Sequence, residues 1–213
     1  MGLNQEHQYY SHSRSEILPF LPSGIKFALD VGCGNGSFGK ILKEHVGCVV
    51  WGVEPNQTVA LEAQQNLDKV INSPFDKNLN LEHQKFDCIF FNDVLEHLVN
   101  PYSALNICKL NLSKNGCIIS SIPNILHFDT IYKILITQDW KYEDAGILDK
   151  THLRFFTKKS IIRMFEECGY KIVSIQGINP AYSTKFKWLN KMLFNHLNDM
   201  KYIQYLTVVQ TLK

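Results

Sequence analysis

The stretch ALDVGCGNGSFG, residues 28–39, places four glycines within eight residues. It continues a short apolar run that is typical of a buried strand, so it predicts a strand, a tight loop and then a helix. Glycine loses more backbone freedom on ordering than any other residue, so four of them together need a reason. Free backbone N–H groups beside a positively polarised helix N-terminus favour a ligand that lies against the main chain.

The spacing of these glycines separates two classes of ligand. The dinucleotide fingerprint is G-x-G-x-x-G, and Gly32 and Gly34 fit it, but its third position is occupied by Ser37. The pattern present is Asp-x-Gly-x-Gly-x-Gly, from Asp30 to Gly36. A carboxylate just before the loop opposes a pyrophosphate and favours a ligand with an ammonium or sulfonium group. A nicotinamide-dependent dehydrogenase therefore remains only as a disfavoured alternative.

A second acidic residue supports a nucleoside-type ligand. The next predicted strand covers residues 48–54 and ends at Glu54, 18 residues beyond Gly36. In open α/β sheets the ligand lies at the carboxyl ends of the strands, where such a carboxylate accepts both hydroxyls of a ribose. The loop and Glu54 together predict a ribose-containing ligand.

Strands and helices alternate along most of the chain. We predict strands over residues 27–31, 48–54, 69–72, 85–93, 117–123, 171–178 and 205–212. We predict helices over residues 4–18, 37–46, 57–67, 103–112, 183–199 and from an N-cap at Thr157 to a stop at Gly169. This order predicts a mostly parallel sheet with helices on both faces. Residues 1–213 are expected to form one domain, with 1–26 as a helical lead-in and 124–157 and 179–204 as substrate-covering or interface insertions.

Composition narrows the function classes. With 213 residues and 45% hydrophobic side chains, the chain has an ordinary globular balance. A net charge of +2, spread along the chain, gives no electrostatic case for nucleic acid or an anionic membrane. Its apolar runs fall short of the roughly 18 residues of a membrane span, and the polar start is not a signal peptide. Six scattered cysteines predict buried free thiols, a cytoplasmic location and no metal site.

Four motifs occur in a fixed order: LDVGCGNG (29–36), GVEPN (52–56), FDCIFFNDVLEHL (86–98) and LSKNGCIISSIPN (112–124). In this order and spacing they resemble the class I S-adenosylmethionine-dependent methyltransferases, and most closely the small-molecule O-methyltransferases of the ubiquinone-biosynthesis type. The segment GILDKTHLRFFT (146–157) resembles a subgroup associated with bacterial polysaccharide and other glycan clusters. The resemblance implies a Rossmann-like seven-stranded sheet whose last strand runs antiparallel beside the sixth.

The resemblance also implies a cofactor, S-adenosyl-L-methionine, with S-adenosyl-L-homocysteine as product. The residues it assigns to the cofactor's methionine, sulfonium and ribose parts are Asp30, Gly32, Gly34, Gly36, Asn92, Asp93 and Glu54. From YYSHSRSEIL (9–18), Tyr10 and Arg14 are expected at the methionine carboxylate, because arginine is a two-pronged charged donor. Ser73 or Asp76 is expected at the adenine.

The chemistry needs alignment and a proton acceptor. Displacement at the methyl carbon requires the acceptor atom at roughly 3–3.5 Å. A general base adds on the order of 10²–10⁴-fold for a hydroxyl acceptor, and histidine suits this role. We predict His152 first and His97 second as base, although both also have a purely structural interpretation. His127 and Arg154 are expected at the substrate, with Arg154 as anchor for an anionic acceptor such as a sugar phosphate.

Three function classes remain at this point. The favoured one is a methyltransferase that O-methylates a small molecule such as a sugar or glycan precursor, as a monomer or a homodimer. A second is a methyltransferase-like scaffold without activity. A nucleic-acid methyltransferase is disfavoured, because NDVL (92–95) stands where the amino-directed enzymes carry an Asn/Asp-Pro-Pro-aromatic motif. We expect a small-molecule partner, no nucleic acid and no membrane span.

Overall fold

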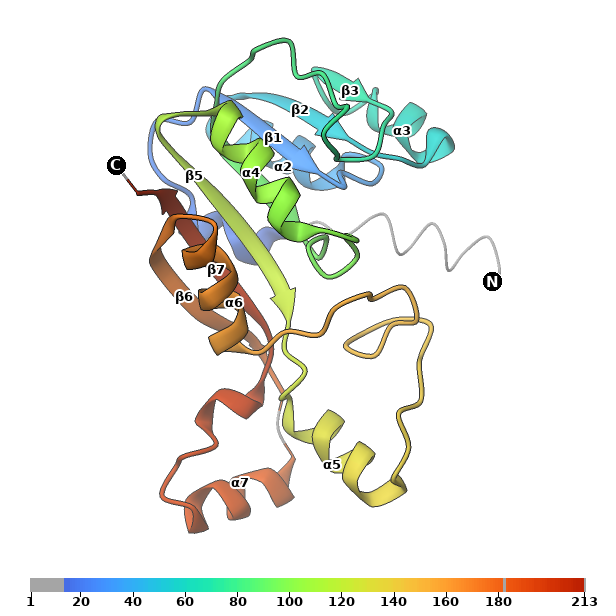
Figure 1. Cartoon of the computed structure of the whole chain (residues 1–213), viewed down its shortest axis with the longest axis vertical. Helices are drawn as coiled ribbons and strands as arrows, with labels where there is room; N and C mark the ends of the chain where they lie inside the picture. Colours follow the sequence, from blue (N-terminus) through green and yellow to red (C-terminus); the bar gives the residue numbers. More distant parts are fainter. Residues whose placement is uncertain (1–13, 182, 213) are drawn as a thin grey trace.

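A computed structural model describes residues 14–181 and 183–212. Its centre is a seven-stranded sheet in the order β3-β2-β1-β4-β5-β7-β6 (Figure 1). The strands are β1 Phe27–Val31, β2 Val49–Val53, β3 Lys69–Ile71, β4 Phe86–Asn92, β5 Leu112–Pro123, β6 Tyr170–Pro180 and β7 Tyr202–Thr211. β1 to β5 pair in parallel, and β7 runs antiparallel between β5 and β6. The predicted mostly parallel sheet with an antiparallel last strand is confirmed.

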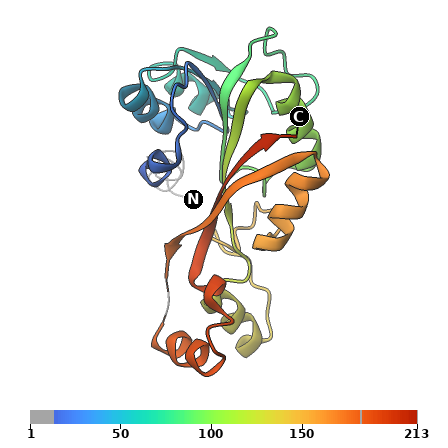
Figure 2. The same ribbon diagram turned by 90° about the vertical axis from the view of Figure 1, so that its left-hand side faces the viewer.

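Helices cover both faces of the sheet. The α-helices are α2 Ser37–Val46, α3 Gln57–Ala63, α4 Pro101–Asn111, α5 Phe128–Thr137, α6 Lys158–Glu167 and α7 Thr184–Met192, and the 3-10 helices are η1 Ser15–Phe20 and η2 Asn198–Lys201. Successive strand residues point to opposite faces, so Ala28 packs with α2 and η1 whereas Leu29 packs with α4 and α6. Figure 2 shows these two layers on opposite sides of the sheet.

Local sequence signals set several helix ends. The Asn56 side chain accepts hydrogen bonds from the backbone N–H groups of Thr58 and Val59 and so begins α3. Thr157 and Ser160 form a reciprocal capping box at the start of α6, which confirms the predicted N-cap. These ends matter for function because α3 begins three residues after Glu54 and α6 begins directly after the 146–157 segment.

Two predicted helices differ from the structure. The segment 183–199 is not one helix, because α7 ends at Met192 and Phe194 and Asn195 take positive φ angles of 49° and 64°. The described part of the lead-in is the 3-10 helix η1, with Pro19 inside it. Proline removes a backbone donor, which disfavours a longer α-helix there. Residues before Arg14 lie outside the described part of the chain.

The two predicted insertions lie side by side beyond the carboxyl end of β5 (Figure 1). The rings of Phe128 on α5 and Phe186 on α7 pack with their centroids 5.1 Å apart. Both helices leave apolar side chains exposed, with Leu135 on α5 and Trp188 on α7 each at 69%, and Phe194 just after α7 is 86% exposed. The single-domain organisation and the interface role of these segments stay predictions. Within residues 14–181 and 183–212, no helix combines the length and apolarity needed to cross a membrane.

Candidate active site

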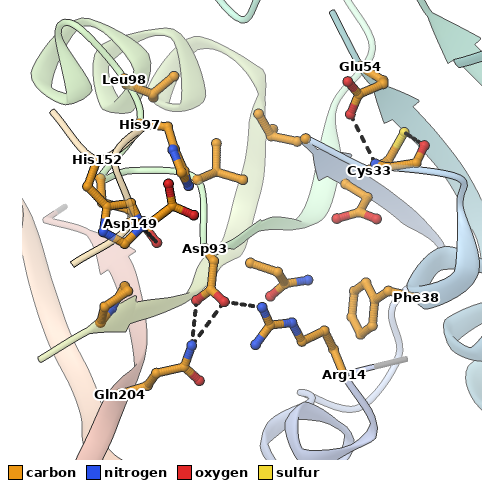
Figure 3. Close-up of a pocket in the computed structure, with 18 of the residues that line it drawn as sticks. Arg14, Cys33, Phe38, Glu54, Asp93, His97, Leu98, Asp149, His152 and Gln204 are labelled. Carbon is orange, nitrogen blue, oxygen red and sulfur yellow. Dashed lines mark hydrogen bonds and ion pairs between the residues drawn. The ribbon is translucent and has the colours of Figure 1, made fainter. Parts of the chain in front are cut away.

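A cavity of about 820 Å³ lies at the carboxyl ends of β1, β2 and β4. The chain runs from β1 to β2 on one side and returns to β4 on the other, so this edge is the topological switch point where open α/β sheets bind ligands. Most of the residues that line it come from the N-terminal end of the described chain (14 and 16), the ends of β1 and β2 (30–34 and 53–55), the segment after β4 (92–98), and residues 145–152 with the start of β7. In Figure 3, Asp93 lies between the Glu54 side and the His97–His152 side of this cavity.

The glycine loop is bound to the end of β2. The backbone N–H groups of Gly32 and Cys33 donate to the Val53 carbonyl oxygen at 2.8 and 3.2 Å, and the Gly34 N–H donates to Glu54 Oε2 at 3.1 Å. The N–H of Gly36 donates to the Cys33 carbonyl oxygen at 2.9 Å. The expectation of free N–H groups is therefore wrong at these four positions, because the loop uses them to hold its own shape.

Two of the glycines are required for reasons that the sequence did not reveal. Gly32 has a φ of +67°, and a Cβ there would lie 2.7 Å from Val94 Cγ2. Gly36 has a φ of +79°, and a Cβ there would lie 3.1 Å from Asn66 Cβ and from Leu67 Cγ. Gly32 lines the cavity, whereas Gly36 does not. Gly36 thus serves the packing of the loop against the end of α3.

Glu54 is buried where predicted, at the end of β2. It is 4% exposed, and its Oε1 accepts the Asn56 N–H at 2.9 Å while its Oε2 accepts the Gly34 N–H. Burial raises the pKa of Glu54, and these two hydrogen bonds oppose the rise. Each oxygen keeps a further lone pair, so the carboxylate can also accept from a ligand in the cavity.

Asp30 provides the test of whether the site fits a cationic cofactor. It is the last residue but one of β1, is 2% exposed, and its Oδ2 has no hydrogen-bond partner among the described residues. Burial and then the charge of Glu54 raise its pKa from 3.8 to about 8, against the attraction of Arg14. A buried carboxyl oxygen without a partner is costly unless a ligand satisfies it. The ammonium and sulfonium groups of S-adenosylmethionine fit this requirement.

Arg14 and Asp93 form an ion pair across the mouth of the cavity (Figure 3). Burial opposes the charge on Arg14, but the Asp93 carboxylate outweighs it and the pKa of Arg14 is raised. Asp93 also accepts from Ser121 Oγ at 3.0 Å and from Gln204 Nε2 at 2.9 Å. The buried side-chain amide of the neighbouring Asn92 has no hydrogen-bond partner among the described residues. Tyr10 lies outside the described residues.

The two predicted bases lie together with an acid that sequence reasoning did not assign. The rings of His97 and His152 are 4.7 Å apart, and His152 Nε2 lies 3.9 Å from Glu96 Oε1. His152 Nδ1 lies 3.1 Å from the Ile147 carbonyl oxygen, and His97 Nδ1 lies 3.2 Å from the Thr151 carbonyl oxygen. These contacts fix both rings at one wall of the cavity.

Burial dominates the electrostatics of this cluster. Glu96 is 1% exposed, and neither carboxyl oxygen has a hydrogen-bond partner among the described residues. Burial and then the charge of Asp93 raise the pKa of Glu96 well above its usual range. Burial and then His152 lower the pKa of His97. Glu96, His97 and His152 offer ligand atoms within 4.8 Å of one another, so the expected absence of a metal stays a prediction.

Several residues named from the sequence lie elsewhere. Ser73 and Asp76 do not line the cavity, although the adjacent Pro74 and Phe75 do. His127 Nε2 lies 2.9 Å from the Ala181 carbonyl oxygen and links the two insertions. Arg154 Nη2 donates to the Val99 carbonyl oxygen at 2.5 Å, and this arginine lines a separate cavity of about 380 Å³. The predicted roles of these residues are therefore not supported by a place in the main cavity.

Other lining residues had no signal in the sequence. Asp149 is 3% exposed and its Oδ1 accepts from the N–H and hydroxyl of Thr151 at 2.7 and 2.6 Å. Gln204 comes from β7, 111 residues after Asp93, and reaches the site because β7 inserts beside β5. Glu96 directly precedes His97 in the loop after β4, so its place beside that histidine follows from the sequence.

Comparison with known proteins assigns the fold and the family. Among solved structures, the S-adenosylmethionine-dependent methyltransferase from Archaeoglobus fulgidus aligns with a TM-score of 0.70 at 18% identity, over 96% of this chain and 93% of that one. The plantazolicin methyltransferase BpumL, solved with S-adenosylhomocysteine, aligns with a TM-score of 0.63 at 17% identity, over 97% and 82%. The fold is thus the Rossmann-like fold of the class I methyltransferases.

Sequence relatives point the same way. The chain is 23% identical over 185 residues to a ubiquinone biosynthesis O-methyltransferase of Glaesserella parasuis, covering 78% of this chain and 74% of the relative. It is 27% identical over 174 residues to that of Photobacterium profundum, covering 78% and 72%. Residues 3–175 match the family described as "Methyltransferase domain". The chain belongs to this family and is a class I S-adenosylmethionine-dependent methyltransferase.

Proposed function

We propose that this enzyme transfers the methyl group of S-adenosylmethionine to a hydroxyl group of a small molecule. One observation carries the proposal: the unpartnered Asp30 oxygen, Glu54 and two histidines face a single cavity. The relatives named as O-methyltransferases support oxygen as the acceptor atom. The resemblance of residues 146–157 to glycan-cluster enzymes favours a sugar or glycan precursor as acceptor. The free, buried cysteines support a cytoplasmic location.

The cofactor-side residues would have distinct tasks. S-adenosylmethionine, when bound, supplies a methyl group that already carries its leaving group. Asp30 pairs with the cationic methionine end, and Arg14 binds the methionine carboxylate. Glu54 accepts the ribose hydroxyls through the lone pairs that Gly34 and Asn56 leave free. These contacts fix the direction in which the acceptor must approach.

His152 is the proposed base. Its Nδ1 faces the Ile147 carbonyl oxygen at 3.1 Å, which selects the tautomer with the proton on Nδ1. Nε2 then keeps its lone pair for the hydroxyl proton of the substrate, and Glu96 Oε1, which lies 3.9 Å from Nε2, stabilises the positive charge that forms on the ring. His97 packs against the same ring and limits its rotation. His152 thereby takes the proton of the substrate hydroxyl while the new O–CH₃ bond forms.

The proposal is tested with methyl-labelled S-adenosylmethionine and a panel of sugars, polyols and phenols. We expect label in an acid-stable ether product whose formation requires His152. Label found only on nitrogen or sulfur of the acceptors would contradict O-methylation. Binding of S-adenosylhomocysteine is measured separately, so that a failure of acceptor choice is distinguished from a failure of the cofactor assignment.

A further inference from the structure

The half of the cavity opposite the glycine loop has an unusual charge balance. We call it the acceptor compartment and define it by Glu96, His97, Asp149, His152 and Gln204. We propose that this compartment binds methyl acceptors whose enclosed part is uncharged or cationic. It rejects phosphate, sulfate and carboxylate groups. The inference rests on the proposed function and narrows its substrate class, because it excludes phosphorylated sugars as acceptors.

The arginine side chain next to the acceptor compartment is already paired with acidic side chains. Arg14 is the only lysine or arginine among the described residues that line the cavity. Its guanidinium group is paired with Asp93, and its Nη1 lies 3.6 Å from Glu16 Oε1. Asp93 is further held by Ser121 and Gln204, and the donors of Arg14 that Asp93 leaves free are those proposed to bind the methionine carboxylate, so Arg14 has no charge left for an anionic acceptor. The preceding segment, residues 1–13, contains no lysine or arginine.

The neighbouring basic side chains point elsewhere. The N–H groups of Leu153 and Arg154 donate to the Glu96 carbonyl oxygen at 2.9 and 3.1 Å and so fix this segment. With the backbone held there, His152 lines the main cavity whereas Arg154 lines the separate one. Lys150 is exposed and donates to Asp144 at 2.6 Å. The residue that the sequence suggested as an anion anchor therefore cannot serve the compartment from this position.

The compartment instead presents two buried carboxyl groups. Glu96 and Asp149 are 1% and 3% exposed, and both oxygens of Glu96 lack hydrogen-bond partners among the described residues. An acceptor hydroxyl or ammonium can donate to these oxygens, whereas a phosphate would lose its hydration here without a free cationic side chain to pair with.

The first test needs no knowledge of the acceptor. Inorganic phosphate and sulfate are titrated into the enzyme loaded with S-adenosylhomocysteine, and the imidazole NMR signals of His97 and His152 are followed. We expect no saturable shift in the wild type. We expect a saturable shift after Asp149→Lys, which places a cation in the compartment. A saturable shift in the wild type at millimolar phosphate would overturn the proposal.

The second test uses matched acceptors in the methyl-transfer assay: the same sugar or phenol with a free hydroxyl and with one further hydroxyl phosphorylated. We expect kcat/KM to be at least about 100-fold higher for the free compound. Asp149→Asn should reduce this ratio several-fold, whereas Asp144→Asn, outside the cavity, should leave it unchanged. Equal use of both compounds would overturn the proposal. If the panel yields no acceptor, the phosphate titration decides, and cofactor binding shows separately whether the proposed function has failed.

Discussion

The Gly34 N–H donates to the Glu54 carboxylate at 3.1 Å and ties the loop after β1 to the end of β2. The second oxygen of Glu54 accepts the Asn56 N–H at the start of α3. One buried carboxylate therefore joins three pieces of chain: the glycine loop, the strand end and the following helix. The residue proposed to bind the ribose is also the residue that shapes the loop.

This double role predicts the effect of removing the carboxylate. Glu54→Ala should weaken S-adenosylmethionine binding about 10- to 100-fold, because two ligand hydrogen bonds are lost and the loop loses its support. Glu54→Gln should weaken it less, because an amide oxygen still accepts one N–H. Calorimetric titration measures both, with exposed Glu62→Ala on α3 as the matched control. Wild-type affinity in Glu54→Ala would remove the ribose assignment.

Asp30 predicts a pH dependence of stability in the ligand-free protein. Its pKa rises from 3.8 to about 8 on folding, so between these values the folded state holds a proton that the unfolded state has released. Stability therefore falls as pH rises through this window, and the loss is complete above about pH 8. Asp30→Asn should raise the free energy of unfolding by at least about 1 kcal/mol at alkaline pH and have little effect near pH 4.

The same substitution should weaken S-adenosylmethionine binding, because the cation loses its carboxylate. Urea unfolding at several pH values and calorimetry check the two effects on one variant. A variant that is destabilised equally at all pH values would show that Asp30 is an ordinary structural residue. Unchanged cofactor binding would show that its unpartnered oxygen does not face the ligand.

His152 predicts a separation between binding and turnover. His152→Ala should lower kcat by about 10²-fold or more, because the hydroxyl proton loses its acceptor, and leave S-adenosylhomocysteine affinity within about threefold. The control is His196→Ala, because His196 is exposed in the 179–204 segment and does not line the cavity. Turnover is measured by label transfer across a range of pH. Full activity of His152→Ala would end its candidacy as base.

Alanine substitutions at Gly36 and Gly47 distinguish the energetic cost of backbone strain from the cost of a steric clash. Both glycines have positive φ angles, of 79° and 73°, but a Cβ at Gly47 meets nothing within 4 Å whereas one at Gly36 meets Asn66, Leu67 and Ala63. Gly47→Ala should cost about 1 kcal/mol of unfolding free energy and Gly36→Ala about 2–3 kcal/mol. Equal losses of unfolding free energy in denaturant titrations would mean that the side chains at the end of α3 move aside without a measurable cost.

The fold was largely predictable because its signals are local. Apolar runs, glycines after strands and caps such as Thr157 mark the alternation of strands and helices, and this alternation determines the sheet. The break after α7 was not predictable, because it depends on two positive φ angles at Phe194 and Asn195, residue types that also continue helices. Helix α5 lies within residues 124–157, which the sequence had indicated only as an insertion.

The candidate site was predictable on its cofactor side and much less on its acceptor side. Asp30 and Glu54 lie at the carboxyl ends of adjacent parallel strands, in the last residues of β1 and just after β2, so their proximity follows from sheet topology. Gln204 and Asp149 reach the cavity through the insertion of β7 and through a loop fixed by hydrogen bonds to Glu96, and no local pattern encodes either placement. Arg154 was assigned from its residue type and its place just before a helix, but its side chain donates to the Val99 carbonyl oxygen and lines the separate cavity.

The central claim is that carboxylates at the ends of β1 and β2 bind S-adenosylmethionine in this cavity. The most direct measurement is calorimetric titration of the wild type, Asp30→Asn and Glu54→Ala with S-adenosylmethionine, S-adenosylhomocysteine and NAD. We predict saturable one-to-one binding of the first two ligands to the wild type, weakened in both variants, and no binding of NAD. Binding that is insensitive to both substitutions, or binding of NAD alone, would contradict the claim.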